Sequence, residues 1–307
     1  MATTDTSPGD TAAAGAAPYA VAPDGYRLPA ELRLGPVRLQ IGDLGRSLDY
    51  YERVLGLRAI QRSGAGATLG AQSDETSLIE LRLRKGAVPV PRRGRLGLYH
   101  FALLLPDRAA LGRLVAQLEA LGVRIGASDH LVSEALYLND PDGLGIEVYA
   151  DRPRHTWRMN GPTLAMATDP LDLEDLVRAS AGKAWTGAPA GTRIGHVHLH
   201  VGGLERAAAF YHTGLGLDRI MLDLPGALFL SAGGYHHHLG TNTWASGASP
   251  AAPGDARLLE WTIQLPRQSD IGDAARSLAD SGYQVEREEG DAVVDDPWGT
   301  TLRLTRQ

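Results

Sequence analysis

Two stretches of the chain share one pattern: GPVRLQIGDLGRSLDYYERVLGL, residues 35–57, and GHVHLHVGGLERAAAFYHTGLGL, residues 195–217. Aligned at an offset of 160 residues, they agree at Gly, Val, Leu, Gly, Leu, Arg, Tyr and the closing Leu-Gly-Leu. A second pair of stretches, residues 98–125 and 258–285, matches at the same offset. Two matches in one frame indicate an internal duplication.

Each repeated stretch begins with a short alternating strand, such as Val37-Leu39-Ile41. An amphipathic helix follows and ends at a glycine, as in Ser47 to Val54 and Ala110 to Ala120. Further β-rich segments close the unit, with Asp-Pro turns at 140–143 and 296–299. The sequence therefore predicts four β-α-β-β-β modules, near residues 32–95, 96–152, 192–250 and 256–307.

These modules predict an α+β protein of two domains. We expect modules 1 and 2 to form the first domain, residues 31–152, and modules 3 and 4 to form the second, residues 192–307. Residues 1–30 have the composition of a disordered tail, without the charged and apolar regions of a signal peptide. Residues 153–191 surround a short helical DLEDLVRAS and are expected to form a linker on the surface.

The composition limits the partners of the chain. Of its 307 residues, 43% are hydrophobic and 21% charged, which is typical of a globular protein. The net charge of −6 leads us to expect no nucleic-acid partner. No apolar run approaches the roughly 20 residues of a membrane helix, so we expect no membrane association and a cytoplasmic protein. Because the chain has no cysteine, nitrogen and oxygen atoms must bind any metal.

The repeats show where unusual residues lie on the predicted strands. Aligned residues differ as follows: His100 against Glu260, Glu147 against Arg303, His196 against Pro36, and His236, His237 and His238 against Thr76, Ser77 and Leu78. Glu147 lies in the apolar strand GIEVY, where a buried carboxylate is costly unless it is paired or bound to a metal. A salt bridge for Glu147 and a core position for His100 remain the ordinary alternatives.

Strand alternation places His196, His198 and His200 on one face of the strand in GHVHLHV. Same-face neighbours are about 7 Å apart along a strand, so we expect one of the three to bind a metal. Two imidazoles and one carboxylate on one side of a metal form the facial triad of non-haem Fe(II) oxygenases. With His100 and Glu147, the sequence offers this set.

The module pattern with its Leu-Gly-Leu ending resembles the vicinal oxygen chelate superfamily of glyoxalases, bleomycin-resistance proteins and extradiol dioxygenases. The resemblance covers nearly all the chain after residue 30 and is most specific for type I extradiol ring-cleaving dioxygenases, the catechol 2,3-dioxygenase group. It implies that the two domains are half-barrels, and that Fe(II), or Mn(II), is bound by His100, Glu147 and His196. It also implies an aromatic diol and O₂ as substrates, and a homo-oligomer. In most members the ligands come from modules 3 and 4, so the pairing of modules stays open here.

The resemblance implies further site residues. His130 and Tyr137, 17 and 10 residues before Glu147, correspond to side chains that line the substrate cavity. The run GGYHHHLG, residues 233–240, corresponds to a segment with an acid–base histidine. Strand alternation directs either His237 inward or both His236 and His238. Of these, His237 aligns best with the acid–base histidine. We also expect aromatic residues to shape the ring pocket, namely Trp244, Tyr149 and Trp157.

The resulting hypothesis is Fe(II)- and O₂-dependent extradiol cleavage of a catechol, in which His237 or His238 takes and returns the substrate proton. One alternative is a glyoxalase-type metal-dependent isomerase or lyase. That chemistry needs a carboxylate from each of two paired modules, whereas module 3 offers histidines or Thr241. The other alternative is a metal-free binding protein of the bleomycin-resistance kind, which leaves Glu147 unexplained.

Overall fold

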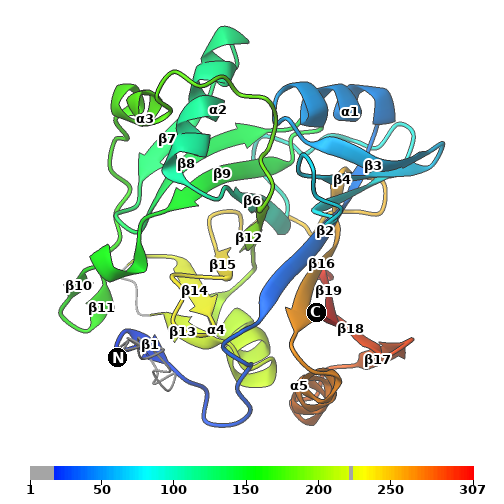
Figure 1. The fold of residues 1–307 in the computed structure, drawn as a ribbon. Coiled ribbons are helices and arrows are strands. Elements are labelled where there is room, and N and C mark those ends of the chain that lie inside the picture. The colour runs from blue at the N-terminus through cyan, green and yellow to red at the C-terminus, as the bar shows by residue number, and fades with distance from the viewer. Residues whose placement is uncertain (1–16, 221–223) are drawn as a thin grey trace, which may run out of the picture.

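The computed structural model describes residues 17–220 and 224–307, which fold into two large mixed sheets (Figure 1). The nine-stranded sheet has, in spatial order, β1 (Ala20–Val21), β13 (Asp218–Ile220), β14 (Ala227–Ser231), β15 (Leu239–Asn242), β12 (Arg193–His200), β6 (Gly97–Leu104), β9 (Gly145–Asp151), β8 (Ser133–Asn139) and β7 (Gly126–Asp129). The eight-stranded sheet has β17 (Val285–Glu288), β18 (Asp291–Asp295), β19 (Thr301–Arg306), β16 (Arg257–Leu265), β2 (Arg33–Ile41), β5 (Ile79–Leu83), β4 (Gly66–Gly70) and β3 (Arg58–Ser63).

Each module has the predicted β-α-β-β-β order, which confirms the fold class. The helices are α1 (Leu44–Arg53), α2 (Arg108–Ala120), α4 (Leu204–Ala208), continued by a π-helical turn at Ala209–Gly214, and α5 (Gln268–Asp280). Asp43 and Asp107 cap α1 and α2 by accepting hydrogen bonds from Arg46 N and Ala110 N. The central glycine of each Leu-Gly-Leu ending, Gly56 or Gly216, has a positive φ that other residues rarely adopt.

The pairing of the modules differs from the expected domains. β12 of module 3 pairs with β6 of module 2, and β16 of module 4 pairs with β2 of module 1, both antiparallel. The stretches 31–152 and 192–307 therefore each contribute one module to either sheet, and neither stretch forms a sheet by itself. The first strand of every module needs an antiparallel neighbour, and its local pattern does not specify which one.

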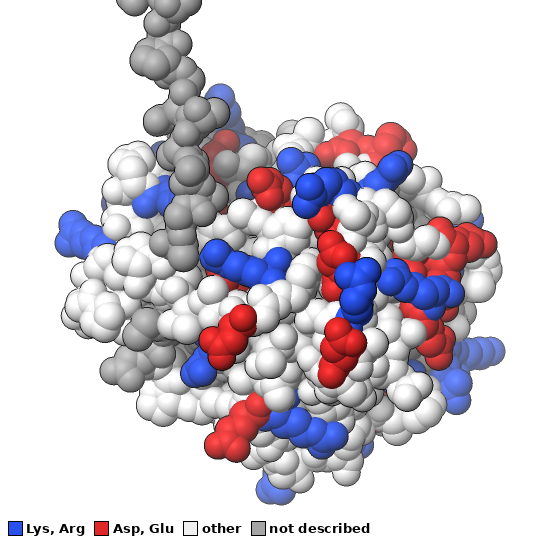
Figure 2. Space-filling model, turned by 90° about the horizontal axis from the view of Figure 1, so that it is seen from below, with Lys and Arg blue, Asp and Glu red and all other residues white. Residues whose placement is uncertain are grey.

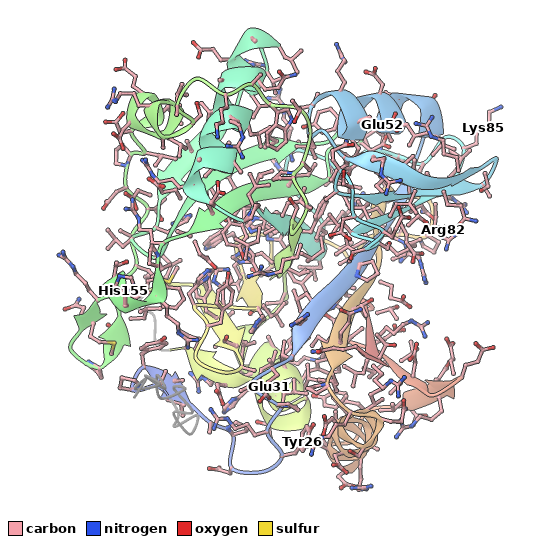
Figure 3. All side chains as sticks on the ribbon, in the orientation of Figure 1. Tyr26, Glu31, Glu52, Arg82, Lys85 and His155 are labelled. Atoms are coloured by element: carbon pink, nitrogen blue, oxygen red, sulfur yellow. The ribbon has the colours of Figure 1, made fainter. Side chains whose placement is uncertain are left out.

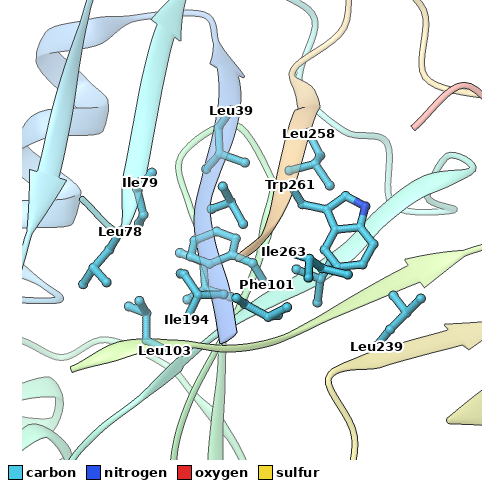
Figure 4. Packing of buried hydrophobic residues seen from close by; sticks show 14 of the residues in the cluster. Leu39, Leu78, Ile79, Phe101, Leu103, Ile194, Leu239, Leu258, Trp261 and Ile263 are labelled. Carbon is cyan, nitrogen blue, oxygen red and sulfur yellow. The ribbon is translucent and has the colours of Figure 1, made fainter. Parts of the chain in front are cut away.

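A continuous hydrophobic core joins the two sheets (Figure 4). Phe101 and Leu103 on β6 and Ile194 on β12 pack against Leu39 on β2 and Trp261 on β16, with Trp261 fully buried. Alternation along the strands sends the neighbouring residues of β6 and β12 to the opposite face of the nine-stranded sheet. That opposite face carries the unusual residues identified in the sequence.

Residues 17–30 are folded, contrary to the tail expected over 1–30, whose residues 1–16 lie outside the described range. β1 pairs with β13, and the buried Tyr19 donates a hydrogen bond to Gly234 O at 2.7 Å. Tyr26 donates to Asp270 O at 3.3 Å and lies beside α5 in Figure 3. These apolar and aromatic side chains bury enough surface to hold the segment against modules 3 and 4.

The linker between the repeats also has its own structure. It contains a 3₁₀ turn (Arg154–Thr156), a hairpin of β10 (Met159–Asn160) and β11 (Thr163–Leu164), and α3 (Leu173–Ala179) at the predicted helical sequence. Asp129 and Asp169 exchange both backbone hydrogen bonds, at 2.9 and 3.0 Å, which ties the linker to the end of β7. His155 lies at an outer corner and is exposed (Figure 3).

Lys and Arg are interspersed with Asp and Glu on the face shown in Figure 2, which has no large area of a single charge. Along the described residues, no helix combines the length and the apolar character that crossing a membrane requires.

Candidate metal centre

Three strands of the nine-stranded sheet bring His100, Glu147 and His196 together. β6 carries His100, its parallel neighbour β9 carries Glu147, and its antiparallel neighbour β12 carries His196. Their chain neighbours Phe101, Ile146, Val148 and Val197 belong to the core, so alternation turns all three side chains to the face away from the core. They are 5%, 3% and 1% exposed, which removes them from bulk water.

The ligand atoms of these residues converge on one point. One atom from each lies within 4.8 Å of the others. His100 Nε2 and His196 Nε2 lie 3.0 and 3.1 Å from the same atom, Glu147 Oε2. Among the described residues, buried His100 Nε2 has no hydrogen-bond partner, despite its closeness to the carboxylate. An orphaned imidazole nitrogen aimed at a buried carboxylate fits a bound cation better than a closed hydrogen-bond network.

The electrostatics suit metal binding. Burial raises the pKa of Glu147, but His196 and His100 more than offset this effect and hold the pKa well below its usual value. Burial lowers the pKa of His100, although Glu147 opposes that shift. The site therefore favours a carboxylate anion beside a neutral imidazole, which are the forms that bind a divalent metal.

His198 and His200, the other histidines on this face of β12, have different partners. Asn242 donates its amide hydrogen to His198 Nε2 at 3.0 Å and accepts from His200 Nδ1 at 2.7 Å. Its oxygen also accepts from Trp244 N, which fixes the orientation of the amide. His198 Nε2 is thus paired with Asn242, whereas His196 Nε2 is the atom of this strand face that lies beside Glu147.

The metal-ligand cluster opens into a cavity of about 540 Å³. Its lining residues come from the nine-stranded sheet, the linker and the loops of module 3: Tyr99, His100, Ser128, His130, Leu131, Ser133, Tyr137, Glu147, Asn160, Thr163, Leu164, Ala165, Met166, Ala167, Thr168, His198, Leu224, Phe229, His237 and Trp244. A volume of this size encloses a small organic molecule. The linker therefore forms one wall of the cavity, in addition to connecting the repeats.

A β-bulge moves Tyr99 from the face predicted by simple alternation. His198 pairs with His100, but the next pair is Leu199 with Leu98, so Tyr99 has no partner on β12. An extra residue in one strand redirects its side chain. Simple alternation would place Tyr99 on the face opposite His100, but it lines the cavity with its ring 4.9 Å from the ring of His100.

His130 and Tyr137 both line the cavity, next to the linker. His130 Nδ1 donates to the carbonyl oxygen of Ala167 at 2.6 Å, so Nε2 of the neutral ring accepts from Tyr137 OH at 2.6 Å. Burial, reinforced by Glu147, raises the pKa of Tyr137 and keeps its hydroxyl protonated. The linker thus fixes the tautomer of His130, a contact that the sequence patterns do not reveal.

The three consecutive histidines lie in the loop between β14 and β15, so strand alternation does not apply to them. His237 lines the cavity, with its ring 4.2 Å from the ring of His196. His236 Nε2 instead faces Asp151 Oδ1 at 3.0 Å. His238 is outside the cavity lining, and its Nδ1 lies 3.1 Å from Ser231 Oγ and accepts from Ala232 N. Of the three histidines, His237 is the one that lines the cavity, and its acid–base role stays a prediction.

The expected aromatic residues take different places. Trp244 lines the cavity and is 53% exposed at its mouth. Tyr149 and Trp157 are outside the lining: the fully buried Tyr149 packs its ring 4.9 Å from His196, and Trp157 lies 5.5 Å from His236. Tyr149 thus packs against the candidate metal ligand His196, and Trp157 packs against His236 in the histidine loop. The sequence alone does not distinguish an aromatic residue that packs behind the ligands from one that lines the substrate cavity.

The fold and the site together define a protein of duplicated βαβββ modules with a candidate two-histidine, one-carboxylate metal centre. The chain belongs to the Glyoxalase/Bleomycin resistance protein/Dioxygenase superfamily, whose family model matches residues 33–148 and 193–303. It is 44% identical to "Catechol-2,3-dioxygenase" of Bacillus subtilis (strain 168) over 271 residues, which cover 87% of this chain and 94% of that relative.

Solved structures share the fold at low sequence identity. A protein from Bacillus subtilis subsp. subtilis str. 168 named "putative dioxygenase" is 16% identical with a TM-score of 0.62, covering 92% of this chain and 86% of that one. Glyoxalase I from Zea mays is 19% identical with a TM-score of 0.54, covering 90% and 92%. These similarities show a shared fold. Because proteins of this fold differ in function, the function must be argued from the site.

Proposed function

We propose that the protein is an Fe(II)-dependent extradiol dioxygenase that opens a catechol-type ring beside its diol and adds both atoms of O₂ to the product. The observation that carries this proposal is the convergence of His100, Glu147 and His196, of which His100 and Glu147 line the cavity. The 44% identity to a relative named catechol-2,3-dioxygenase supports the same reaction. We also propose that the enzyme is cytoplasmic.

The three residues would hold Fe(II), for which two imidazoles and one carboxylate are a characteristic donor set, and the same donors accept Mn(II). When bound, the metal supplies Lewis acidity toward the diol and a place for O₂ beside it. The protein keeps this region dry, because all three side chains are at least nine-tenths buried. Tyr149 and the hydrogen-bonded sheet hold the ligands in place.

The side chains around the metal centre suit the handling of a catechol. His237 is the proposed acid–base group because it lines the cavity beside His196. Burial, together with His196 and His236, lowers its pKa well below the usual value, so the ring is neutral. Tyr137 donates its hydroxyl hydrogen to His130 and presents its oxygen to the cavity. We propose that this pair orients the diol and the oxygen-derived group.

Both alternatives fit the site less well. A glyoxalase-type isomerase needs a further carboxylate from module 3, but among the described residues the ligand cluster contains Glu147 as its sole carboxylate. The corresponding strand β15 carries Thr241, whose hydroxyl is bound to Leu228 O. A metal-free binding protein would leave His100 Nε2 buried and unpaired beside a carboxylate, at an energetic cost of about 1–3 kcal/mol.

The test is to load the purified protein with Fe(II) under anaerobic conditions, add catechol, and then admit air. We expect stoichiometric O₂ consumption and a yellow ring-fission product. Glu147→Gln should abolish both, whereas Glu119→Gln, at an exposed position on α2, should leave both intact. Iron binding without O₂ consumption across a panel of catechols would overturn the proposal, as would full activity of Glu147→Gln.

A further inference from the structure

A chain of hydrogen bonds runs from the end of β9 to the cavity. Asp151 Oδ1 lies 3.0 Å from His236 Nε2, and His236 Nδ1 lies 2.8 Å from His237 Nδ1. His237 then lines the cavity. Its second ring nitrogen, Nε2, has no hydrogen-bond partner among the described residues. Three side chains thus connect a carboxylate outside the cavity to an imidazole nitrogen available inside it.

The chemistry of the donors and acceptors sets a direction along this chain. A carboxylate only accepts, so His236 must carry its hydrogen on Nε2. Nδ1 of a neutral His236 is then an acceptor, and His237 must donate to it from Nδ1. A neutral imidazole has one N–H, so Nε2 of His237 is left without a hydrogen. Its lone pair is the basic group that reaches the cavity.

Residues next to Asp151 and the histidine loop fix the direction of these hydrogen bonds. Tyr235 OH donates to both carboxylate oxygens of Asp151, at 3.1 and 3.0 Å, which keeps Asp151 an acceptor. Tyr149 OH lies 2.7 Å from Tyr235 OH and serves as its donor. Arg154 of the linker donates to Gly233 O at 2.6 Å and fixes the start of the histidine loop.

The other sheet provides an internal comparison. β15 pairs with β12 in the register with which β5 pairs with β2, so His236 and His237 correspond to Thr76 and Ser77. Asp151 corresponds to Gln307, which follows β19. None of the three residues is repeated in the sheet that lacks the metal-ligand cluster, so this chain occurs with the cluster and is not a general feature of the module.

We propose that Asp151 and His236 are positioning residues that hold His237 in the tautomer with its unprotonated Nε2 facing the cavity. The role in catalysis rests on the proposed function. Nε2 takes the proton of a catechol hydroxyl, the oxygen keeps the electron pair, and the imidazolium formed at His237 is balanced through His236 by the Asp151 carboxylate. The same proton returns to the ring-opened product.

The direct test measures the tautomer in the full chain before metal loading, from ¹⁵N shifts of the His237 ring in long-range ¹H–¹⁵N spectra. We expect a protonated Nδ1 and an unprotonated Nε2. His236→Phe removes the acceptor for Nδ1 and should give a mixture of tautomers, whereas His155→Phe, at an exposed position, should not. A protonated Nε2 in the wild-type chain would overturn the proposal, as would an unchanged tautomer in His236→Phe.

A second variant distinguishes the effect of the hydrogen-bond direction from the effect of packing at position 236. In His236→Gln the amide nitrogen donates to Asp151 and the amide oxygen accepts from His237, so the direction of the chain is kept. We expect His236→Gln to retain the tautomer, and His236→Phe to lose about 10²-fold in kcat with KM and iron content unchanged. Equal losses in both variants would contradict the positioning role. If the wild-type chain cleaves no catechol, the spectra still decide the tautomer independently.

Discussion

Glu147 and Arg303 occupy the same place in the two sheets. Glu147 pairs with Ala102 in the first sheet, and Arg303 pairs with Thr262, 160 residues after Ala102, in the second. Where Glu147 meets the two imidazoles, Arg303 forms an ion pair at 3.0 Å with Glu260, which corresponds to His100. One module pair thus carries the candidate metal-ligand cluster, and the other carries a closed ion pair.

Replacing Arg303 should lower stability without affecting the metal. Arg303→Ala would leave Glu260, 7% exposed, with Arg38 as its remaining ion-pair partner, and we expect a loss of about 2–4 kcal/mol. Urea denaturation measures the loss, and metal analysis should still find one iron per chain. The exposed variant Arg276→Ala is the control. A loss of iron in Arg303→Ala would show that the second sheet contributes to binding.

Metal binding should stabilise the fold through Glu147. A ligand that binds only the folded state adds RT ln(1 + [L]/Kd), or about 2.7 kcal/mol at one hundred times Kd. We therefore expect a higher Tm for the iron-loaded wild-type protein than for the metal-free protein. Glu147→Gln should fold but show no such rise, and Glu119→Gln should behave like the wild type. A metal-dependent rise in Glu147→Gln would assign the binding site elsewhere.

Tyr137→Phe should impair the orientation of the substrate without affecting metal binding. The change removes the hydroxyl that donates to His130 at 2.6 Å but keeps the ring in the cavity wall. We expect a kcat lower by about 10²-fold with iron content unchanged, because the Tyr137 oxygen no longer accepts from the diol and a displaced substrate costs about that much. Steady-state kinetics with metal analysis test this. Full activity would remove Tyr137 from the proposed mechanism, and Tyr50→Phe on α1 provides the control.

The cavity should prefer catechols with apolar substituents. Its lining carries Glu147 but neither Lys nor Arg, and much of the wall is apolar, including Leu164, Met166, Phe229 and Trp244. Each buried methylene adds about 0.8 kcal/mol, so kcat/KM should rise about fourfold per methylene from catechol to short 4-alkylcatechols. 3,4-Dihydroxybenzoate, with its carboxylate, should react poorly. A preference for the carboxylated ring would contradict this assignment of the wall.

Asp140 should make the stability depend on pH. Burial, with Asp142 nearby, raises its pKa to about 6 despite the hydrogen bonds that it accepts from Leu144 N and Asp142 N. Between its unfolded pKa of about 4 and this value, the folded state holds more protons, so stability falls as pH rises and levels off above about 6. The fall is on the order of 3 kcal/mol.

Asp140→Asn should remove most of this pH dependence, because the amide oxygen still accepts both backbone hydrogen bonds. Urea denaturation of the metal-free protein at pH 4 to 7 measures the slope, with Asp280→Asn, at an exposed position, as the control. An unchanged slope in Asp140→Asn would assign the effect to other groups.

Local patterns in the sequence were sufficient to predict which residues of the candidate site share one face of the sheet. Alternation in HFALL, GIEVY and GHVHLHV places His100, Glu147 and His196 on the face away from apolar neighbours, and the structure brings them together there. The position of Tyr99 could not be obtained in this way, because a bulge depends on how two distant strands pair. The histidine run was misread as strand because its neighbours Leu239 and Gly240 do belong to one.

The sequence by itself determined the four modules, their strands and turns, and the face on which His100, Glu147 and His196 lie. These are properties of short segments, set by side-chain alternation and backbone conformation. Tertiary structure decided that module 2 pairs with module 3, that the linker closes the cavity against His130, and that Asp151 reaches His236. The cost of closing a loop grows only slowly with its length, so chain distance does not select partners, and packing between distant surfaces does.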